Sequence, residues 1–441
     1  MGNAIRKTKA ELGLADLYLT ARRSLPGGDD VSAVRSSAFD RFSTAGLPHA
    51  RVEAWRYTDL RRLMRDAKDI AAPPDATAKR LAGEAKDLFK GSGFRRLMIV
   101  DGTFVPELSD LDDLEQGLTI RAMSDALASD EPLLSQRLGP IVPENEPALA
   151  LNTALASDGV VICVGPGIVL KRAIQVSFVT TRAAAASMFT RSLIVIGSGA
   201  SASFVEQHQG PDRSEYQVNT AIQLVIGDEA KVDYVKVTSE GDSALHLGSL
   251  LANVGARASF NQFGFVSGGA VVRNQLFVHL AGEGTVANLR GVSLLAGKQH
   301  ADTTLAIDHS APGCQSREEF KAVVGDRARA VFQGKILVSP GAQQTDAKMM
   351  SRALLLSDEA EADCKPELEI FADDVQCGHG STTGAIDEEL RFYLMARGLP
   401  AKDADALLIQ AFAGSVIETI ADESVRERLT EAMVGWLDGR E

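Results

Sequence analysis

Short runs of alternating apolar and polar residues fill the middle of the chain and predict β-strands. Four of these runs are GVVICVG, RSLIVIGS, AIQLVIGD and GKILVSP. They follow one another between about residues 157 and 383, with almost no helical periodicity between them. Glycine is frequent there and proline is rare, as expected where many short strands meet at tight turns. The pattern therefore predicts a long all-β tract.

One motif recurs along this tract: a turn and a small residue, followed by alternating residues that end on an aromatic side chain. Copies begin at Ala200, Ala230, Ala256 and Ala328, and looser copies begin at Thr285 and Ala360. Successive copies lie 26 to 43 residues apart. This spacing favours stacked coils with variable loops over a sandwich with a turn about every 8 to 12 residues. We predict a β-solenoid whose coils close a shared core; a β-sandwich with coincidental spacing is the alternative.

Helical periodicity predicts helices before the β tract. Apolar residues recur at helical spacing from 34 to 42, and a second helix is expected from 79 to 89. The sequence RRLMIVDGTFVPEL predicts two strands around Asp101 and Gly102. Residues 1–150 are therefore expected to form an N-terminal helical region with a small strand pair.

Helical periodicity returns after the β tract. An acidic turn that starts at Asp387 begins a helix that ends at Gly398, and two more helices follow. The second helix is expected to bury Ala404, Leu407, Leu408, Ala411, Ser415 and Ile420. The third is expected to bury Val425, Leu429, Ala432, Met433 and Trp436. We therefore divide the rest of the chain into a β-solenoid core (151–383) and a C-terminal helical domain (384–441).

Composition narrows the class of protein. The 441 residues include 46 basic and 59 acidic ones, and the net charge of −13 argues against nucleic-acid binding as the main function. The four cysteines form no CxxC pair, which predicts neither a disulfide framework nor a zinc ribbon and fits a reducing cytosol. Neither a secretory signal nor an apolar run of roughly 18 residues is present. We expect a soluble, cytoplasmic protein.

Several sequence motifs for catalysis are missing or out of place. Gly197, Gly199 and Ala202 match a dinucleotide-binding fingerprint, but the following residues alternate like a strand and predict a turn. The chain contains no GxxxxGK[ST] loop, so any ATP chemistry must come from a partner. It also contains neither the GxSxG motif of hydrolases nor the HExxH motif of zinc proteases. Seven histidines are scattered along the chain, and a lone histidine in a solenoid is expected to be structural.

One group of residues has metal-binding chemistry. Cys364, Cys377 and His379 lie close in sequence, beside Asp373 and Asp374. Thiolate, imidazole and carboxylate all bind iron or other borderline metals, although the spacing matches no closed four-ligand motif. The two aspartates also suggest a polysaccharide-cleaving solenoid, but adjacent strand residues point to opposite faces, so we expect them in a turn or at an edge.

Two segments resemble one known family. Residues 345–399 (TDAKMMSRALLLSDEAEADCKPELEIFADDVQCGHGSTTGAIDEELRFYLMARGL) closely resemble the C-terminal signature of the SufB/SufD family of iron-sulfur cluster assembly proteins. Residues 46–60 (GLPHARVEAWRYTDL) look like a segment that marks its SufD members. The Gly-His-Gly context of His379 also favours SufD over SufB. Cys364 departs from the family pattern, and we interpret it as a buried structural thiol.

The resemblance implies a mainly β protein: a right-handed parallel β-helix flanked by N-terminal and C-terminal α-helical regions. It also implies a complex with a SufB paralogue and with SufC, an ABC-type ATPase. The chain would be a non-catalytic scaffold subunit of this SufBCD complex, one that helps iron to enter. It would not be an enzyme.

The same resemblance implies two sites. The last β-helix coils would pair with SufB. At that interface His379 is the first candidate to hold a nascent cluster or its iron, and Cys377 is the second. The chain alone would bind no cofactor tightly. The C-terminal helices would dock SufC, with contacts at Asp387, Glu388, Arg391, Phe392, Tyr393 and Arg397.

Two alternatives remain open at this stage. One is a SufB-like scaffold that acts as a homodimer, because an open solenoid edge is a template for a second copy. The other is a carbohydrate-active β-helix enzyme, which the missing secretion signal disfavours.

Overall fold

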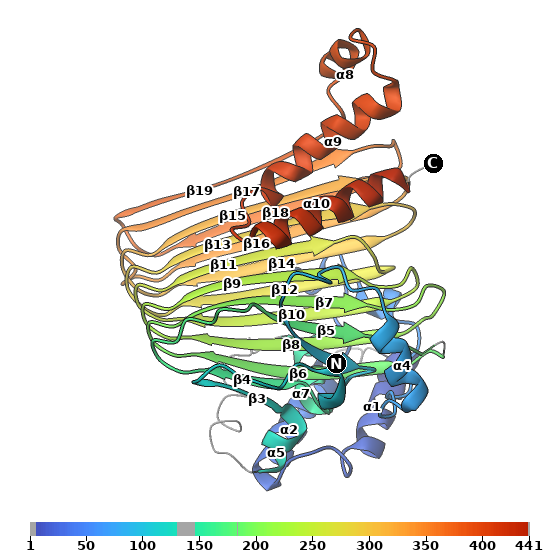
Figure 1. The fold of residues 1–441 in the computed structure, drawn as a ribbon, viewed down its shortest axis with the longest axis vertical. Coiled ribbons are helices and arrows are strands. Elements are labelled where there is room, and N and C mark those ends of the chain that lie inside the picture. The colour runs from blue at the N-terminus through green and yellow to red at the C-terminus, as the bar shows by residue number, and fades with distance from the viewer. Residues whose placement is uncertain (1–5, 130–145, 183, 440–441) are drawn as a thin grey trace.

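The computed structural model describes residues 6–129, 146–182 and 184–439 and consists of a β-solenoid with helices at both ends (Figure 1). Its helices are α1 (Lys9–Ala21), α2 (Asp29–Ala45), α3 (Leu60–Leu63), α4 (Ala76–Glu84), α5 (Met123–Ala128), α7 (Pro147–Leu155), α8 (Glu388–Met395), α9 (Ala401–Ile417) and α10 (Glu423–Asp438), with short 3-10 turns η1 (Glu53–Trp55) and η2 (Pro106–Leu108). The predicted fold class is confirmed.

The strands follow one another along the solenoid. They are β1 (Arg95–Val100), β2 (Thr103–Phe104), β3 (Leu118–Ala122), β4 (Val160–Val164), β5 (Ile174–Val179), β6 (Ser187–Ile196), β7 (Ser201–Gln209), β8 (Gln217–Ile226), β9 (Lys231–Ser239) and β10 (Leu245–Val254). They continue with β11 (Ser259–Val266), β12 (Val271–Leu280), β13 (Val286–Leu295), β14 (His300–His309), β15 (Gln315–Val324), β16 (Arg329–Val338), β17 (Thr345–Leu355), β18 (Glu361–Ile370) and β19 (Val375–Gly384).

Each coil contributes one strand to each of two sheets. Odd-numbered strands from β5 to β19 pair in parallel in one sheet, and even-numbered strands from β4 to β18 pair in parallel in the other. Apolar side chains from both sheets fill the space between them. Glu206 and His208 of β7 are also buried, on the same side of their strand as Phe204 of this core. The interior of the solenoid is therefore apolar for most of its length and polar in places.

The recurring motif marks the corners of these coils, with one correction. Ala200 and Ala230 are buried at equivalent corners, but the strand register places Ala258, not Ala256, at the third one. Ala328 is buried at a corner of the other sheet, before β16. The motif therefore marks corners of both sheets. The longest gap runs from Thr285, before β13 of the odd-numbered sheet, to Ala328, before β16 of the even-numbered sheet, and so spans about one and a half coils. Gly199, which belongs to the apparent dinucleotide fingerprint, lies in the turn between β6 and β7 with φ of 68°.

The N-terminal region closes the first end of the solenoid. The predicted strand pair is β1 and β2; β1 joins β5 in parallel, and β3 joins β4 antiparallel. Helices α1, α2 and α7 pack against the even-numbered sheet through an apolar cluster that includes Phe189 and Leu247. The helix expected from 79 to 89 is the shorter α4. Helix α7 crosses the predicted division at residue 150, and residues 130–145 lie outside the described part of the chain.

The C-terminal helices cover the odd-numbered sheet. Helices α9 and α10 pack across β7, β9, β11, β13 and β15 (Figure 1). The buried face of α10 agrees with the prediction, but the predicted face of α9 is wrong in part: Ile409, Ala413 and Val416 are buried, whereas Leu407 is exposed. Because α9 is apolar on more than one side, its periodicity alone did not select the face that meets the sheet.

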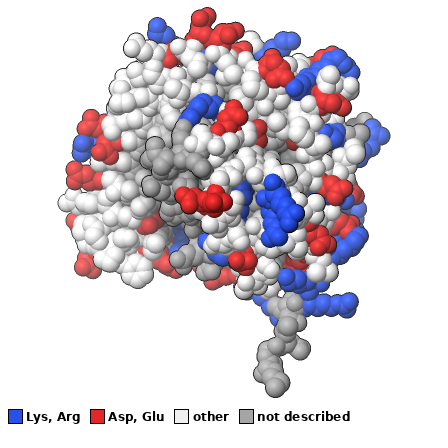
Figure 2. Space-filling model, turned by 90° about the horizontal axis from the view of Figure 1, so that it is seen from below, with Lys and Arg blue, Asp and Glu red and all other residues white. Residues whose placement is uncertain are grey.

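The face at the N-terminal end carries charges of both signs. Lys and Arg side chains lie beside Asp and Glu side chains rather than in one basic field (Figure 2). This face therefore lacks the continuous positive surface that nucleic-acid binding requires. In the described residues, no helix is long and apolar enough to cross a membrane.

Candidate functional site

The last coil of the solenoid is open. Strands β18 and β19 are each the final strand of their sheet in the described residues, so each has a neighbour on one side only. The side chains of β18 are half-buried or exposed, unlike those of the inner coils. Ile370 and Phe371 at the following corner are 38% and 62% exposed. Unpaired strand edges with apolar side chains are a surface on which further strands can be added.

The predicted ligand residues lie on this open coil. Cys377 stands beside the buried Ala347 in the strand register, and His379 stands beside the buried Met349. Both residues therefore belong to rows of side chains that face the solenoid interior, but no further coil in the described part of the chain covers them. Cys364 of β18 packs against the same core from the opposite sheet. The interpretation of Cys364 as a buried thiol is only partly right, because its side chain is half-buried.

The sequence neighbours do not form a ready-made metal site. Among the described residues, the ligand atoms of Cys364, Cys377 and His379 do not come together as a group within 4.8 Å. Asp373 and Asp374 lie in the bend between β18 and β19, as expected. The backbone N–H of Asp374 donates to Gln343 Oε1.

Two nearby groups have shifted pKa values. Burial, with the negative charges of Asp346 and Glu318, raises the pKa of the Cys377 thiol above its ordinary value. Burial raises the pKa of Glu318 to about 8. Glu318 occupies the same interior row as His379, two coils earlier, with Met349 between them. Cys377 is therefore a protonated thiol near pH 7, and an incoming metal must displace its proton.

Helix α8 projects from the same end of the molecule (Figure 1). It begins at Asp387, whose carboxylate accepts hydrogen bonds from two backbone N–H groups of the first turn. None of its residues is buried, and Phe392 is 74% exposed. The guanidinium of Arg397 lies over the ring of Tyr393, and Arg391 pairs with Asp405 of α9 at 2.8 Å. Of the predicted docking residues, Arg391 thus stabilises the contact between α8 and α9. Phe392 and Tyr393 form an exposed apolar surface. Glu388 is exposed beside Arg391.

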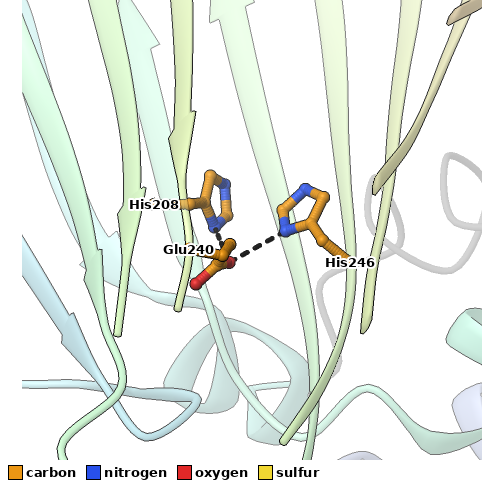
Figure 3. Close-up of side chains that lie close together, drawn as sticks. All are labelled: His208, Glu240 and His246. Atoms are coloured by element: carbon orange, nitrogen blue, oxygen red, sulfur yellow. Dashed lines mark hydrogen bonds and ion pairs between the residues drawn. The ribbon is translucent and has the colours of Figure 1, made fainter. Parts of the chain in front are cut away.

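A polar cluster inside the solenoid was not predicted. His208, Glu240 and His246 are buried and lie together inside the solenoid, on the coils of β7 to β10 (Figure 3). The three residues match no sequence motif, because only the stacking of coils brings them together. A signal was available: the alternation that places Phe204 inside also places Glu206 and His208 inside.

Comparison with known proteins gives consistent matches along most of the chain. Residues 178–412 match the family described as SUF system FeS cluster assembly, SufBD core domain, and residues 8–176 match the SufBD protein N-terminal region. An iron-sulfur cluster assembly SufBD family protein of Synechocystis is 31% identical over 90% of this chain and 89% of its own length. The iron-sulfur cluster assembly protein SufD of Escherichia coli is 29% identical over 87% of this chain and 88% of its own length.

Proposed function

Because this chain belongs to the SufBD family of iron-sulfur cluster assembly proteins, we propose that it is a SufD-type, non-catalytic scaffold subunit. Its partners are a SufB-like paralogue and a SufC-type ATPase. The open last coil that carries Cys377 and His379 is the observation that supports this proposal most directly. A scaffold needs such an incomplete surface, because a cluster held between two proteins requires ligands from both.

The SufB-like paralogue adds its own strands to β18 and β19. The unpaired edges supply main-chain hydrogen bonds, and the exposed Ile370 and Phe371 supply apolar contact. In this arrangement His379 and Cys377 face the paralogue and hold iron or a nascent cluster as transient cargo. Imidazole and thiolate are suitable ligands for iron.

The SufC-type ATPase docks on α8. An exposed aromatic side chain on a projecting helix is a common anchor of protein interfaces, and Phe392 has this position. ATP hydrolysis takes place in the partner, since this chain carries no P-loop. The four free cysteines fit work in a reducing compartment such as the cytoplasm.

A homodimeric, SufB-like scaffold is the second candidate. The observation that favours it is the same open coil, because two copies of this chain are able to pair through β18 and β19. The sedimentation behaviour of the chain with and without the SufB-like paralogue separates the two: the first proposal requires the paralogue to displace any homodimer. The polysaccharide-cleaving enzyme is not favoured, since Asp373 and Asp374 lie in a bend rather than across a cleft.

The experiment for the ligand assignment is a His379→Ala variant within the purified three-protein complex. We expect unchanged assembly of the complex and a lower yield of iron and acid-labile sulfide per complex, with a smaller loss for Cys377→Ser. Cys163→Ser, a half-buried thiol on β4 at the other end of the solenoid, is the matched control. An unchanged cluster yield in His379→Ala would remove His379 from the site.

A further inference from the structure

The buried cluster of His208, Glu240 and His246 has the composition of a metal site. His208 lies on β7, Glu240 directly follows β9, and His246 lies on β10, so neighbouring coils of the solenoid contribute one side chain each. Their ligand atoms lie within 4.8 Å of one another. The two imidazoles meet edge to face, with ring centroids 4.6 Å apart. Two histidines and one carboxylate are a common donor set for divalent transition metals.

Surrounding side chains orient His208 toward Glu240. Nε2 of His208 lies 2.6 Å from Glu206 Oε1. Glu206 also accepts a hydrogen bond from the Tyr234 hydroxyl and pairs with Lys236. A carboxylate only accepts, so Nε2 carries a proton, and in the neutral imidazole the lone pair is then on Nδ1. Nδ1 has no hydrogen-bond partner and lies 3.8 Å from Glu240 Oε1.

Glu240 and His246 complete the same arrangement. The Tyr216 hydroxyl donates to Glu240 Oε2 at 2.7 Å, which leaves Oε1 directed toward the histidines. Nδ1 of His246 lies 2.9 Å from that Oε1, and Nε2 of His246 has no partner. Second-layer carboxylate and hydroxyl groups that fix the ligands in this way are typical of metal sites.

We propose that His208 Nδ1, Glu240 Oε1 and His246 Nδ1 bind a divalent first-row transition-metal ion. Bonds of about 2.1 Å to a tetrahedral ion separate neighbouring donors by roughly 3.4 Å. The two donor distances to Glu240 Oε1, 2.9 and 3.8 Å, lie on either side of this value. Small side-chain movements therefore suffice to form the site, and the proton of His246 Nδ1 moves to the unpartnered Nε2.

The charge of the cluster favours a cation. Two carboxylates, Glu206 and Glu240, are buried with one ammonium group, that of Lys236. An uncompensated negative charge in a protein interior is strongly unfavourable, so the cluster gains from a bound cation.

The structure also offers room for a water ligand on the side of His208 and Glu240. A cavity of about 20 Å³ is lined by His208, Glu240 and Thr190, which is enough for one water molecule as a further ligand. Glu240 also lines a groove of about 690 Å³ on the outer face, between the odd-numbered sheet and α10. Gly248 leaves room for the side chains behind the site, because a Cβ there would collide with the Lys236 ammonium and His246 Nε2.

This site is distinct from the proposed cargo site. It lies on the coils of β7 to β10, whereas Cys377 and His379 lie on the last coil. Binding needs this chain alone, so a negative result here leaves the proposed assembly function untouched.

The test uses the purified full chain, freed of metal with a chelator and titrated with Co²⁺. We expect one equivalent to bind with the visible absorption of a tetrahedral or five-coordinate ion, and Zn²⁺ to displace it. His246→Gln and Glu240→Gln are each expected to weaken Co²⁺ binding at least tenfold. His309→Gln, which changes another buried histidine of the solenoid, and the double variant Cys377→Ser/His379→Ala should bind Co²⁺ like the unaltered chain.

Binding that persists in His246→Gln and Glu240→Gln, or that is lost in Cys377→Ser/His379→Ala, would overturn the assignment. Anomalous diffraction at the cobalt edge from crystals of the unaltered chain tests it without any substitution that could unfold the protein. A peak between His208, Glu240 and His246 supports the site. A peak elsewhere, or no bound Co²⁺, rejects it.

Discussion

The guanidinium of Arg273 lies over the indole ring of Trp55, 3.8 Å from its centroid. Trp55 belongs to the short η1 turn of the N-terminal region, whereas Arg273 belongs to β12 in the middle of the solenoid. The indole N–H also donates to Glu146, and the Thr58 hydroxyl donates to Asp302 of β14. The segment of residues 46–60, whose resemblance to SufD was noted in the sequence, thus provides one of the contacts that hold the N-terminal region against the solenoid.

Loss of the Trp55 ring should weaken this contact. Trp55 is fully buried, so Trp55→Ala is expected to lower the free energy of unfolding by about 3–5 kcal/mol. Trp55→Phe keeps most of the apolar contact and should have a smaller effect. Urea denaturation followed by circular dichroism measures both, with Leu12→Ala on the exposed side of α1 as the control. A Trp55→Ala loss no larger than that of the control would show that the contact contributes little.

The sequence was sufficient to predict the solenoid and its two helical ends. The alternation of each strand is local, and so are the glycine turns that separate the strands. The sheet to which each corner belongs was not predictable in the same way, because Ala200 and Ala328 have similar sequence surroundings but lie in different sheets. The buried face of α9 also depended on the sheet beneath it rather than on its own periodicity.

The same difference between local sequence patterns and contacts that are distant in sequence applies to the candidate sites. Cys377 and His379 could be proposed from the sequence because they lie close together in a recognisable segment. His208, Glu240 and His246 were missed because only the strand register brings them together. Contacts between coils are set by the length of each loop, and no single run of sequence contains that information.

Glu318 should make stability depend on pH. Burial raises its pKa from the ordinary 4.5 to about 8, so between these values the folded chain holds a proton that the unfolded chain has released. This contribution to stability is complete below about pH 4.5 and is lost as pH rises toward about 8. Glu318→Gln is expected to remove that part of the slope and to stabilise the chain at the alkaline end.

Urea denaturation across this pH range measures the slope, and Glu359→Gln at an exposed turn is the matched control. Equal slopes for the unaltered chain and for Glu318→Gln would mean that Glu318 is ionised in the folded protein.

Substitution of Phe392 tests the proposed ATPase contact. Phe392→Asp places a charge on the exposed apolar surface of α8 and should weaken binding of the SufC-type ATPase at least tenfold, because central aromatic anchors carry much of an interface's binding energy. Binding of the SufB-like paralogue should not change. Pull-down and titration assays measure both, with Leu12→Asp at the opposite end as the control. Full ATPase binding by Phe392→Asp would place the contact elsewhere.

Substitution of Phe371 tests the proposed pairing through the last coil. Phe371→Asp should abolish stable association with the SufB-like paralogue, because it places a charge beside the open strand edges. Since Phe371 is exposed, the free energy of unfolding of the isolated chain should change by no more than about 0.5 kcal/mol. Analytical ultracentrifugation of the mixed proteins measures the association. A heterodimer that survives this change would argue for a different interface.

Co-purification of this chain with the SufB-like and SufC-type proteins of its own organism tests the scaffold proposal most directly. The proposal predicts a stable complex of all three proteins, with ATPase activity and iron and sulfide content that fall when this chain is left out. If the chain associates with neither protein, and the other two reach the same activity and cluster content without it, the proposed function is wrong.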